Sequence, residues 1–219
     1  SNKEHYMNNV SHYIDHTNLR QDALQREIMD LCEQGINFDF ASVCVNPVHV
    51  PLVVSILKDE RPKTCAVIGF PLGADSFEMK FAEARFLVHQ GAEELDMVLN
   101  VGALKQGEVR VIEKEIGQVV DAADGNCVKV IIETCLLTKK EKILACEIAR
   151  SAGANFVKTS TGFSSGGATV EDVKLIRKTV GSDMGVKASG GIRTLDDLRL
   201  MVSAGADRIG TSSGMEMVS

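Results

Sequence analysis

The stretch Ser151-Ala-Gly-Ala-Asn-Phe-Val-Lys-Thr-Ser160 returns, with changes, as Ser203-Ala-Gly-Ala-Asp-Arg-Ile-Gly-Thr-Ser212. Each copy predicts the end of a helix, a glycine turn, a short strand and then a loop rich in hydroxyl groups. A repeated unit of this kind indicates βα units that build a parallel sheet. The repeat therefore predicts an α/β protein.

The rest of the chain shows the same alternation of short apolar runs and longer amphipathic stretches. Eight such βα units match a (β/α)₈ TIM barrel at the short end of its usual length range. An open doubly wound sheet is the alternative, but no G-x-G-x-x-G follows the first predicted strand. The predicted strands are residues 13–16, 41–45, 65–70, 94–99, 128–132, 155–158, 185–188 and 208–210.

The ends of the predicted helices carry their own signals. Thr138 and Glu141 form a capping box, which places a hydroxyl acceptor ahead of an acidic first turn. Looser versions of this signal are Thr169 with Asp172 and Thr194 with Asp197. Glycine favours the left-handed residue that closes a helix, and four glycines follow helical stretches: Gly35, Gly91, Gly153 and Gly205.

Composition and charge restrict the class of protein. The chain has 219 residues, of which 44% are hydrophobic and 25% charged, and no linker divides it, so we expect one domain over residues 1–219. A formal net charge of −6 argues against binding to nucleic acid or to an anionic membrane, although a local basic site for a small anion stays open. The apolar runs are shorter than the roughly 20 residues that a membrane-spanning helix needs.

The cysteines and the first residues indicate where the protein works. The six cysteines form no C-x-x-C pair, and four of them lie in apolar runs, so we expect reduced thiols in a cytoplasmic protein. Residues 1–10 are polar and of mixed charge, without the apolar core of a signal peptide. We interpret Ser1 and Asn2 as residues left by cloning.

Three charged residues lie at or near the carboxyl ends of predicted strands, where a barrel gathers its active site. Lys158 ends Asn-Phe-Val-Lys, Lys187 lies in Gly-Val-Lys-Ala, and Asp96 lies in Leu-Asp-Met-Val. Burial and a second ammonium both lower a lysine pKa, and a neutral amine is a nucleophile. The pattern therefore predicts a lysine nucleophile, either Lys158 or Lys187, with Asp96 to relay protons. A buried lysine–aspartate ion pair that only supports the barrel is the alternative.

Other polar residues at strand ends are weaker candidates. Asp15, Thr17 and Glu133 follow predicted strands, and Cys44 is either a reactive thiol or a packed one. His12 and His16 are four residues apart in a predicted strand, where this spacing does not bring two ligands together. We therefore predict no metal site.

Three loops rich in glycine and hydroxyl groups follow the last three predicted strands. Backbone N–H groups and hydroxyls bind anions, and barrels often hold phosphate after strands 7 and 8. Arg193 either adds charge to this site or is solvated. The loops are residues 159–167, 189–193 and 211–214.

Taken together, these residues resemble the deoxyribose-phosphate aldolase family, class I aldolases of deoxynucleoside breakdown that need no cofactor. The similarity runs from about Ile14 to Ser213, and the motifs around Lys158 and Lys187 are the most specific. The segments that carry it are Ile14-Asp-His-Thr-Asn-Leu19, Ser42-Val-Cys-Val-Asn-Pro47, Val67-Ile-Gly-Phe-Pro-Leu-Gly73, Glu94-Leu-Asp-Met-Val-Leu-Asn-Val-Gly102, Lys129-Val-Ile-Ile-Glu133, Phe156-Val-Lys-Thr-Ser-Thr-Gly-Phe163, Val186-Lys-Ala-Ser-Gly-Gly-Ile-Arg193 and Arg208-Ile-Gly-Thr-Ser-Ser213.

The resemblance implies a barrel that reversibly cleaves 2-deoxy-D-ribose 5-phosphate to acetaldehyde and D-glyceraldehyde 3-phosphate, in deoxyribonucleotide catabolism. It implies that Lys158 forms the Schiff base, that Lys187 lowers the pKa of Lys158, and that Asp96 belongs to the proton relay. It also implies a phosphate grip and a substrate-facing group: Gly162, Gly190, Gly191, Ser212 and Ser213 for the phosphate, and Asp15, Thr17 and Cys44 for the substrate.

The resemblance also sets expectations for assembly and for one departure. Family members are often dimers, so a homodimer is expected. Some members carry a C-terminal tyrosine that assists proton transfer, whereas the tyrosines of this sequence are Tyr6 and Tyr13. We expect water to fill that role or the role to be absent. Two rival functions stay open: an isomerase or epimerase that uses acid–base chemistry, and a barrel that binds a sugar phosphate without turnover.

Overall fold

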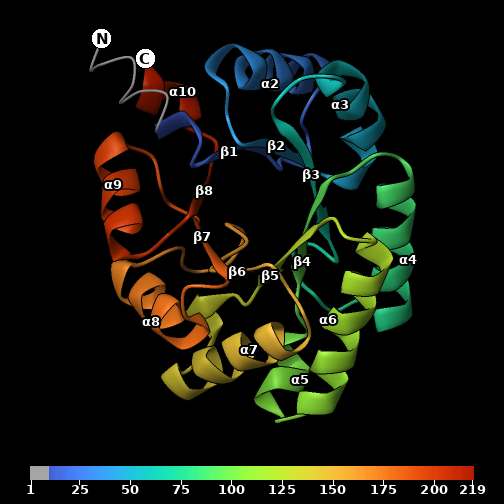
Figure 1. Ribbon diagram of the computed structural model, residues 1–219, viewed down its shortest axis with the longest axis vertical. Coiled ribbons are helices and arrows are strands. Elements are labelled where there is room, and N and C mark those ends of the chain that lie inside the picture. Colours follow the sequence, from blue (N-terminus) through green and yellow to red (C-terminus); the bar gives the residue numbers. More distant parts are fainter. Residues whose placement is uncertain (1–9) are drawn as a thin grey trace.

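The computed structural model describes residues 10–219, so the polar start of the chain, residues 1–9, lies outside the described part. Eight parallel strands form a closed barrel in sequence order, and β1 pairs with β8 through Ile14 and Ile209 (Figure 1). The TIM barrel is confirmed, and the open doubly wound sheet is excluded. The strands are β1 (Ile14–Asn18), β2 (Ser42–Val45), β3 (Lys63–Ile68), β4 (Glu94–Val98), β5 (Cys127–Ile131), β6 (Phe156–Lys158), β7 (Gly185–Ser189) and β8 (Arg208–Thr211).

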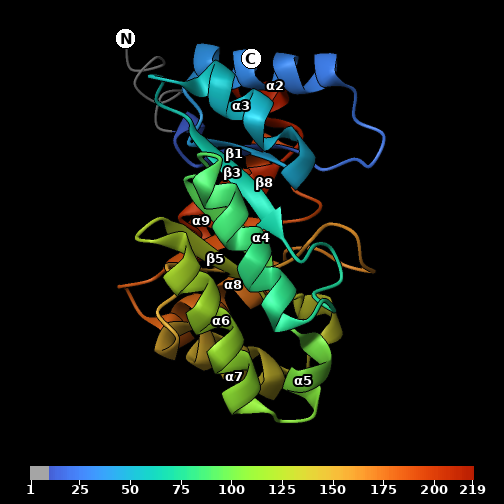
Figure 2. The same cartoon turned by 90° about the vertical axis from the view of Figure 1, so that its right-hand side faces the viewer.

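Helices surround the barrel, as the two perpendicular views show (Figures 1 and 2). None of those within residues 10–219 is long and apolar enough to cross a membrane. They are α2 (Gln25–Phe38), α3 (Val50–Leu57), α4 (Phe77–His89), α5 (Val101–Lys105), α6 (Val109–Ala123), α7 (Lys139–Ser151), α8 (Val170–Val180), α9 (Leu195–Ala204) and α10 (Gly214–Val218), with the short 3₁₀ turns η1 (Pro47–His49) and η2 (Thr134–Leu136).

The predicted helix starts are confirmed. The hydroxyl of Thr138 accepts a hydrogen bond from the Glu141 backbone N–H, and Thr194 and Asp197 form a second complete capping box. Thr169 caps α8 by accepting from the Asp172 N–H. Each helix therefore begins where its sequence signal placed the start.

The prediction for one helix end is wrong. Gly91, Gly153 and Gly205 follow helices with positive φ angles, as expected. Gly35 instead lies inside α2, which continues to Phe38 and closes on Asp39 at φ 57°. A Cβ at Gly35 would lie 2.8 Å from Val43 Cγ2, so this glycine allows close packing of α2 on β2.

The strands overlap the predicted runs, with shifts at their ends. β1 extends to Asn18, so Thr17 lies in the strand and not after it. β3 stops at Ile68 because Gly69, at φ 58°, turns the chain out of the sheet before residue 70.

Alternation along each strand separates two environments. On β4, Leu95 and Met97 belong to the main hydrophobic core that the helices cover, and the residues between them face the barrel interior. On β5, Val128 and Val130 pack outward in the same way. The inward positions on these two strands carry buried charges, Asp96 and Lys129. The barrel interior is therefore the charged layer of this protein.

Candidate active site

A cluster of charged side chains fills the barrel interior. Within residues 10–219, the four cationic side chains of this cluster are held by three carboxylates. Because inward-facing residues come from six different strands, the closed barrel brings together groups up to 193 positions apart in sequence. The cluster consists of Lys129, Lys158, Lys187 and Arg208 with Asp15, Glu94 and Asp96.

Asp96 joins the three lysines of the cluster. Its Oδ2 accepts from Lys187 Nζ at 2.8 Å and from Lys158 Nζ at 3.1 Å, while Lys129 Nζ lies 3.0 Å from Oδ1. Burial alone would raise the pKa of Asp96, but the lysines together hold it well below its ordinary value. The structure thus brings together the three residues that the sequence singled out, Lys158, Lys187 and Asp96.

Lys187 departs from one expectation. Burial would lower the pKa of Lys187, as predicted for a lysine inside a barrel, but Asp15 and Asp96 outweigh burial and raise it above its ordinary value. The two carboxylates lie 2.7 and 2.8 Å from Lys187 Nζ. Lys187 is therefore a charged ammonium. The expectation that its pKa is lowered is wrong, because two carboxylates lie beside the amine and stabilise its charged form.

The Lys158 amine is the one that meets a cavity at the carboxyl ends of the strands. The cavity holds about 700 Å³, and among the lysines of the described chain Lys158 is the one that lines it. The side chain of Lys158 is 3% exposed, whereas those of Lys129 and Lys187 are fully buried. Access from the cavity therefore distinguishes Lys158 from Lys187 as the candidate nucleophile. Sequence spacing alone did not distinguish them.

Several other predicted residues line the same cavity. Thr17 contributes from β1, and its hydroxyl donates to the Asp15 carbonyl at 2.8 Å. The predicted phosphate-side residues Gly162, Gly190, Gly191 and Ser212 line it as well. Asp15, Cys44, Asp96 and Lys187 lie deeper and are buried, and Ser213 stands next to the lining residues.

The glycine loops present backbone to the cavity. Gly162, Gly190 and Gly191 have φ angles of 85°, 88° and 78°, which favour glycine. A Cβ at Gly190 would lie 2.9 Å from the Gly167 Cα, so the loops after β6 and β7 pack backbone on backbone. Thr211 Oγ1 accepts from the Ser213 N–H at 2.9 Å, which orders the loop after β8. This arrangement suits an anion held by N–H and hydroxyl groups.

Glu133, noted only as a strand-end residue, shapes the loop that follows Lys158. Its backbone is left-handed at φ 55°, and its buried carboxylate accepts from Thr161 N at 3.1 Å and from Thr161 Oγ1 at 2.6 Å. Thr161 Oγ1 in turn accepts from the Phe163 N–H at 3.0 Å. Glu133 thereby fixes the segment that carries Gly162.

Sequence reasoning missed Lys129, Glu94 and Arg208 as members of the cluster. Lys129 in Val-Lys-Val has apolar neighbours on both sides, as Lys187 has in Val-Lys-Ala, so its residue pattern was an available signal. Arg208 lies at the start of β8, where its guanidinium reaches back to Asp15 and Glu94, each at 2.8 Å. Nothing in the sequence around Arg208 indicates that its side chain contacts these two carboxylates.

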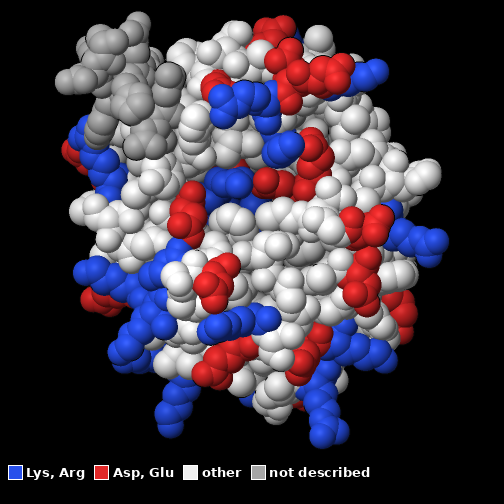
Figure 3. All heavy atoms as spheres, viewed as in Figure 1, with Lys and Arg blue, Asp and Glu red and all other residues white. Residues whose placement is uncertain are grey.

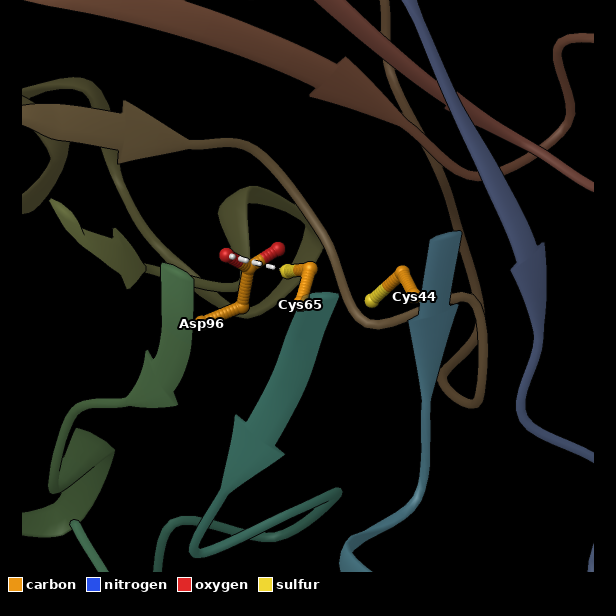
Figure 4. A group of neighbouring side chains, drawn as sticks. All are labelled: Cys44, Cys65 and Asp96. Atoms are coloured by element: carbon orange, nitrogen blue, oxygen red, sulfur yellow. Dashed lines mark hydrogen bonds between the residues drawn. The ribbon is translucent and has the colours of Figure 1, made fainter. Parts of the chain in front are cut away.

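Cys44 and Cys65 lie beside Asp96 in the barrel (Figure 4), and the potential ligand atoms of all three residues lie within 4.8 Å of one another. Cys65 Sγ donates to Asp96 Oδ1 at 3.3 Å, and both thiols are buried. Lys129 Nζ lies 3.0 Å from Asp96 Oδ1 and 3.5 Å from Cys65 Sγ, so a cation here would meet an ammonium. The surroundings of the three groups therefore disfavour a metal ion.

The outer surface carries both signs of charge. Figure 3 shows basic and acidic side chains interspersed over the face that Figure 1 views. Ion pairs at the surface include Lys63 with Glu93 and Lys105 with Glu141. Among the described residues, the largest connected cluster of ion pairs is the one inside the barrel.

A closed parallel barrel with its cavity at the carboxyl ends of the strands defines the TIM-barrel class of enzymes. The model of the DeoC/LacD aldolase family matches residues 10–218, and the chain belongs to this family. Deoxyribose-phosphate aldolase of Caldanaerobacter subterraneus subsp. tengcongensis is 54% identical over 219 residues, which cover 99% of this chain and 95% of that protein. The Geobacillus sp. enzyme of the same name is 55% identical over 96% of this chain and 95% of that protein.

Solved structures agree with the family assignment. The tetrameric deoxyribose phosphate aldolase from Aeropyrum pernix has a TM-score of 0.91 at 33% identity and covers 99% of this chain and 94% of that chain. A crystal structure from Coccidioides immitis has a TM-score of 0.94 at 40% identity, over 97% of this chain and 85% of that chain. The expected family and the barrel are confirmed.

Proposed function

We propose that the protein reversibly cleaves 2-deoxy-D-ribose 5-phosphate to acetaldehyde and D-glyceraldehyde 3-phosphate through a Schiff base on Lys158. The observation that carries the mechanism is the position of Lys158, whose amine meets the cavity and contacts Asp96 beneath it. The relatives named deoxyribose-phosphate aldolase, more than half identical over nearly the whole chain, support the substrate.

The reaction begins at the open-chain aldehyde. The neutral amine of Lys158 attacks C1 to give a carbinolamine, which takes up a proton and loses water to leave an iminium. Asp96 Oδ2 accepts from Lys158 Nζ at 3.1 Å and from Lys187 Nζ at 2.8 Å, and in this proposal Asp96 and the Lys187 ammonium hold the proton-carrying water. The positive iminium is the electron sink, so the proposed chemistry runs without a cofactor.

Bond cleavage follows from the iminium. The water held by Asp96 and Lys187 takes the proton of the C3 hydroxyl, the C2–C3 bond breaks, and its electron pair moves to the iminium to form an enamine. Glyceraldehyde 3-phosphate leaves with C3 as its aldehyde carbon. A proton then adds to the enamine carbon, and water hydrolyses the new iminium, which releases acetaldehyde and restores the Lys158 amine.

The glycine loops at the cavity wall hold the substrate phosphate in this proposal. Gly162, Gly190 and Gly191 offer backbone N–H groups, and Ser212 and Ser213 offer hydroxyls. The Ser213 N–H already donates to Thr211, so the contribution of Ser213 is its side chain. Thr17, Asp15 and Cys44 belong to the β1–β2 side, where Thr17 lines the cavity and the other two lie beneath it.

Reductive trapping tests the function. Incubation with 2-deoxy-D-ribose 5-phosphate and borohydride is expected to leave one covalent adduct on the chain, which peptide mass spectrometry places on Lys158. Acetaldehyde is expected without borohydride. An isomerase would convert the sugar without an adduct, and a binding protein would do neither. The absence of both adduct and acetaldehyde contradicts the proposal.

We propose a homodimer as the working form. Val48, Met79 and Phe86 are 78%, 62% and 59% exposed, and they line a groove of about 630 Å³ between η1 and α4. Exposed apolar side chains gathered in this way are typical of an interface between subunits. The tetrameric relative from Aeropyrum pernix supports assembly within the family.

Sedimentation measures this assembly. Wild-type protein is expected to sediment at twice the mass of one chain, and Phe86→Glu at the mass of one chain, because a carboxylate would be buried without a partner. Leu200→Glu on α9, where Leu200 is 57% exposed away from the groove, is the matched control and keeps the dimer. A monomeric wild-type protein, or a dimeric Phe86→Glu variant, excludes this interface.

Two further assignments belong to the proposal. All six cysteines are unpaired, and four of them are buried, which supports work in the reducing cytoplasm. The family match over residues 10–218 supports a single domain, as the uninterrupted composition predicted.

A further inference from the structure

Within the described chain, Lys129 and Lys187 are the two fully buried cations of the barrel interior. The side chain of Lys129 is fully buried and does not line the cavity. Its Nζ lies 2.7 Å from Glu94 Oε1, 3.0 Å from Asp96 Oδ1 and 3.1 Å from Asp15 Oδ2. Burial would lower the pKa of Lys129, but these carboxylates raise it well above the ordinary value. Lys129 is therefore a permanent charge beneath the reacting groups.

The charges of the cluster do not balance. In the described chain, the cluster holds one cation more than its carboxylates when every group is ionised. The remaining titratable groups that interact with it are the thiols of Cys44, Cys65 and Cys127, from β2, β3 and β5. The cations are Lys129, Lys158, Lys187 and Arg208, from β5 to β8, and the carboxylates are Asp15 from β1 and Glu94 and Asp96 from β4.

An uncompensated charge is costly in a buried site, so release of one proton stabilises the cluster. The number of carboxylate contacts that each cation makes indicates which cation releases this proton. Lys129 contacts three carboxylates, Lys187 two and Arg208 two. Among the carboxylates of residues 10–219, Lys158 contacts Asp96 alone, at 3.1 Å, and shares that oxygen with Lys187. Lys158 is therefore the ammonium held least strongly.

We propose that Lys129 is a positioning residue for the aldolase reaction, because its buried charge makes Lys158 the neutral amine of the cluster. The inference rests on the proposed function and assigns to Lys129 a share of the effect that the family resemblance gave to Lys187 alone. Lys129 acts through Asp96 and Asp15, the two carboxylates that it shares with Lys187.

The pH dependence of kcat/KM tests this assignment through three variants. Lys129→Met removes the excess charge, so the rise of kcat/KM with pH is expected to move to higher pH. The expected shift is about one to two pH units, which is the size of effect that removing one unit charge several ångströms from an amine produces. Glu94→Gln adds to the excess and moves the rise to lower pH. The double variant Lys129→Met with Glu94→Gln restores the original excess and returns the profile toward that of the wild type.

The outcomes separate this role from a structural one. A purely structural Lys129 would lower the yield or the melting temperature and leave the pH of the rise unchanged in all three variants, which overturns the proposal. If Lys129→Met alone fails to fold, Glu94→Gln and the double variant decide: a downward shift that the double variant reverses supports it, and two unshifted profiles overturn it. Borohydride trapping of the wild type on Lys158 tests the proposed function independently of these profiles.

Discussion

Lys158→Arg is expected to fold like the wild type and to lose activity by roughly 10⁴-fold or more, a loss typical of removing a covalent catalyst. The guanidinium keeps its proton at every accessible pH and cannot form an iminium with an aldehyde. Arginine still places a hydrogen-bond donor next to Asp96, so the carboxylate keeps a partner at this position. Rates of acetaldehyde release from 2-deoxy-D-ribose 5-phosphate measure the loss.

A partly buried lysine outside the cavity supplies the control for this substitution. Lys142 on α7 pairs with Asp172 at 2.7 Å, outside the cavity, and Lys142→Arg is expected to retain wild-type activity. Borohydride trapping should leave the Lys158→Arg variant without an adduct. Activity within tenfold of the wild type, or an adduct on another lysine, contradicts the assignment of Lys158 as the nucleophile.

Asp96→Asn is expected to have the second largest effect, on both stability and turnover. The substitution takes away the carboxylate that three buried lysines share, and breaking a buried pair in this way costs about 3–5 kcal/mol. It also removes the group that we propose holds the proton-carrying water, so kcat is expected to fall by about 10²–10⁴-fold. Urea unfolding and steady-state kinetics measure the two effects separately.

The stability loss in Asp96→Asn has a defined pH dependence. The pKa of Asp96 in the folded protein is well below its ordinary value of 3.8, so its contribution is present above that value and is lost as pH falls toward the folded-state pKa. The difference in unfolding free energy between wild type and variant should therefore be large at pH 7 and smaller at pH 3. Asp121→Asn, at an exposed position on α6, is the control and shows little difference at either pH. A difference that is equal at both pH values excludes an ionised Asp96 as its source.

The sequence by itself determined the local elements of this protein. The capping signals at Thr138 and Thr194 act within one turn of a helix, so neighbouring residues suffice to predict them. The apolar runs locate all eight strands, because each strand is read from its own few residues. The glycine-rich loops after β6 and β7 were also predicted from neighbouring residues, because the need for glycine there comes from local backbone angles. The prediction for Gly35 was wrong because glycine is needed there for close packing against Val43, which lies on another element.

Only the tertiary structure decided how the charges of the barrel are shared. Lys158 and Lys187 were equivalent by spacing, and closure of the barrel left one of them facing the cavity and the other between two carboxylates. The same closure brought Lys129 to Asp15 from β5 across the barrel, and Arg208 from the neighbouring strand β8. The physical reason is that an ammonium's protonation depends on every charge within a few ångströms, and those charges come from strands that are far apart in the chain.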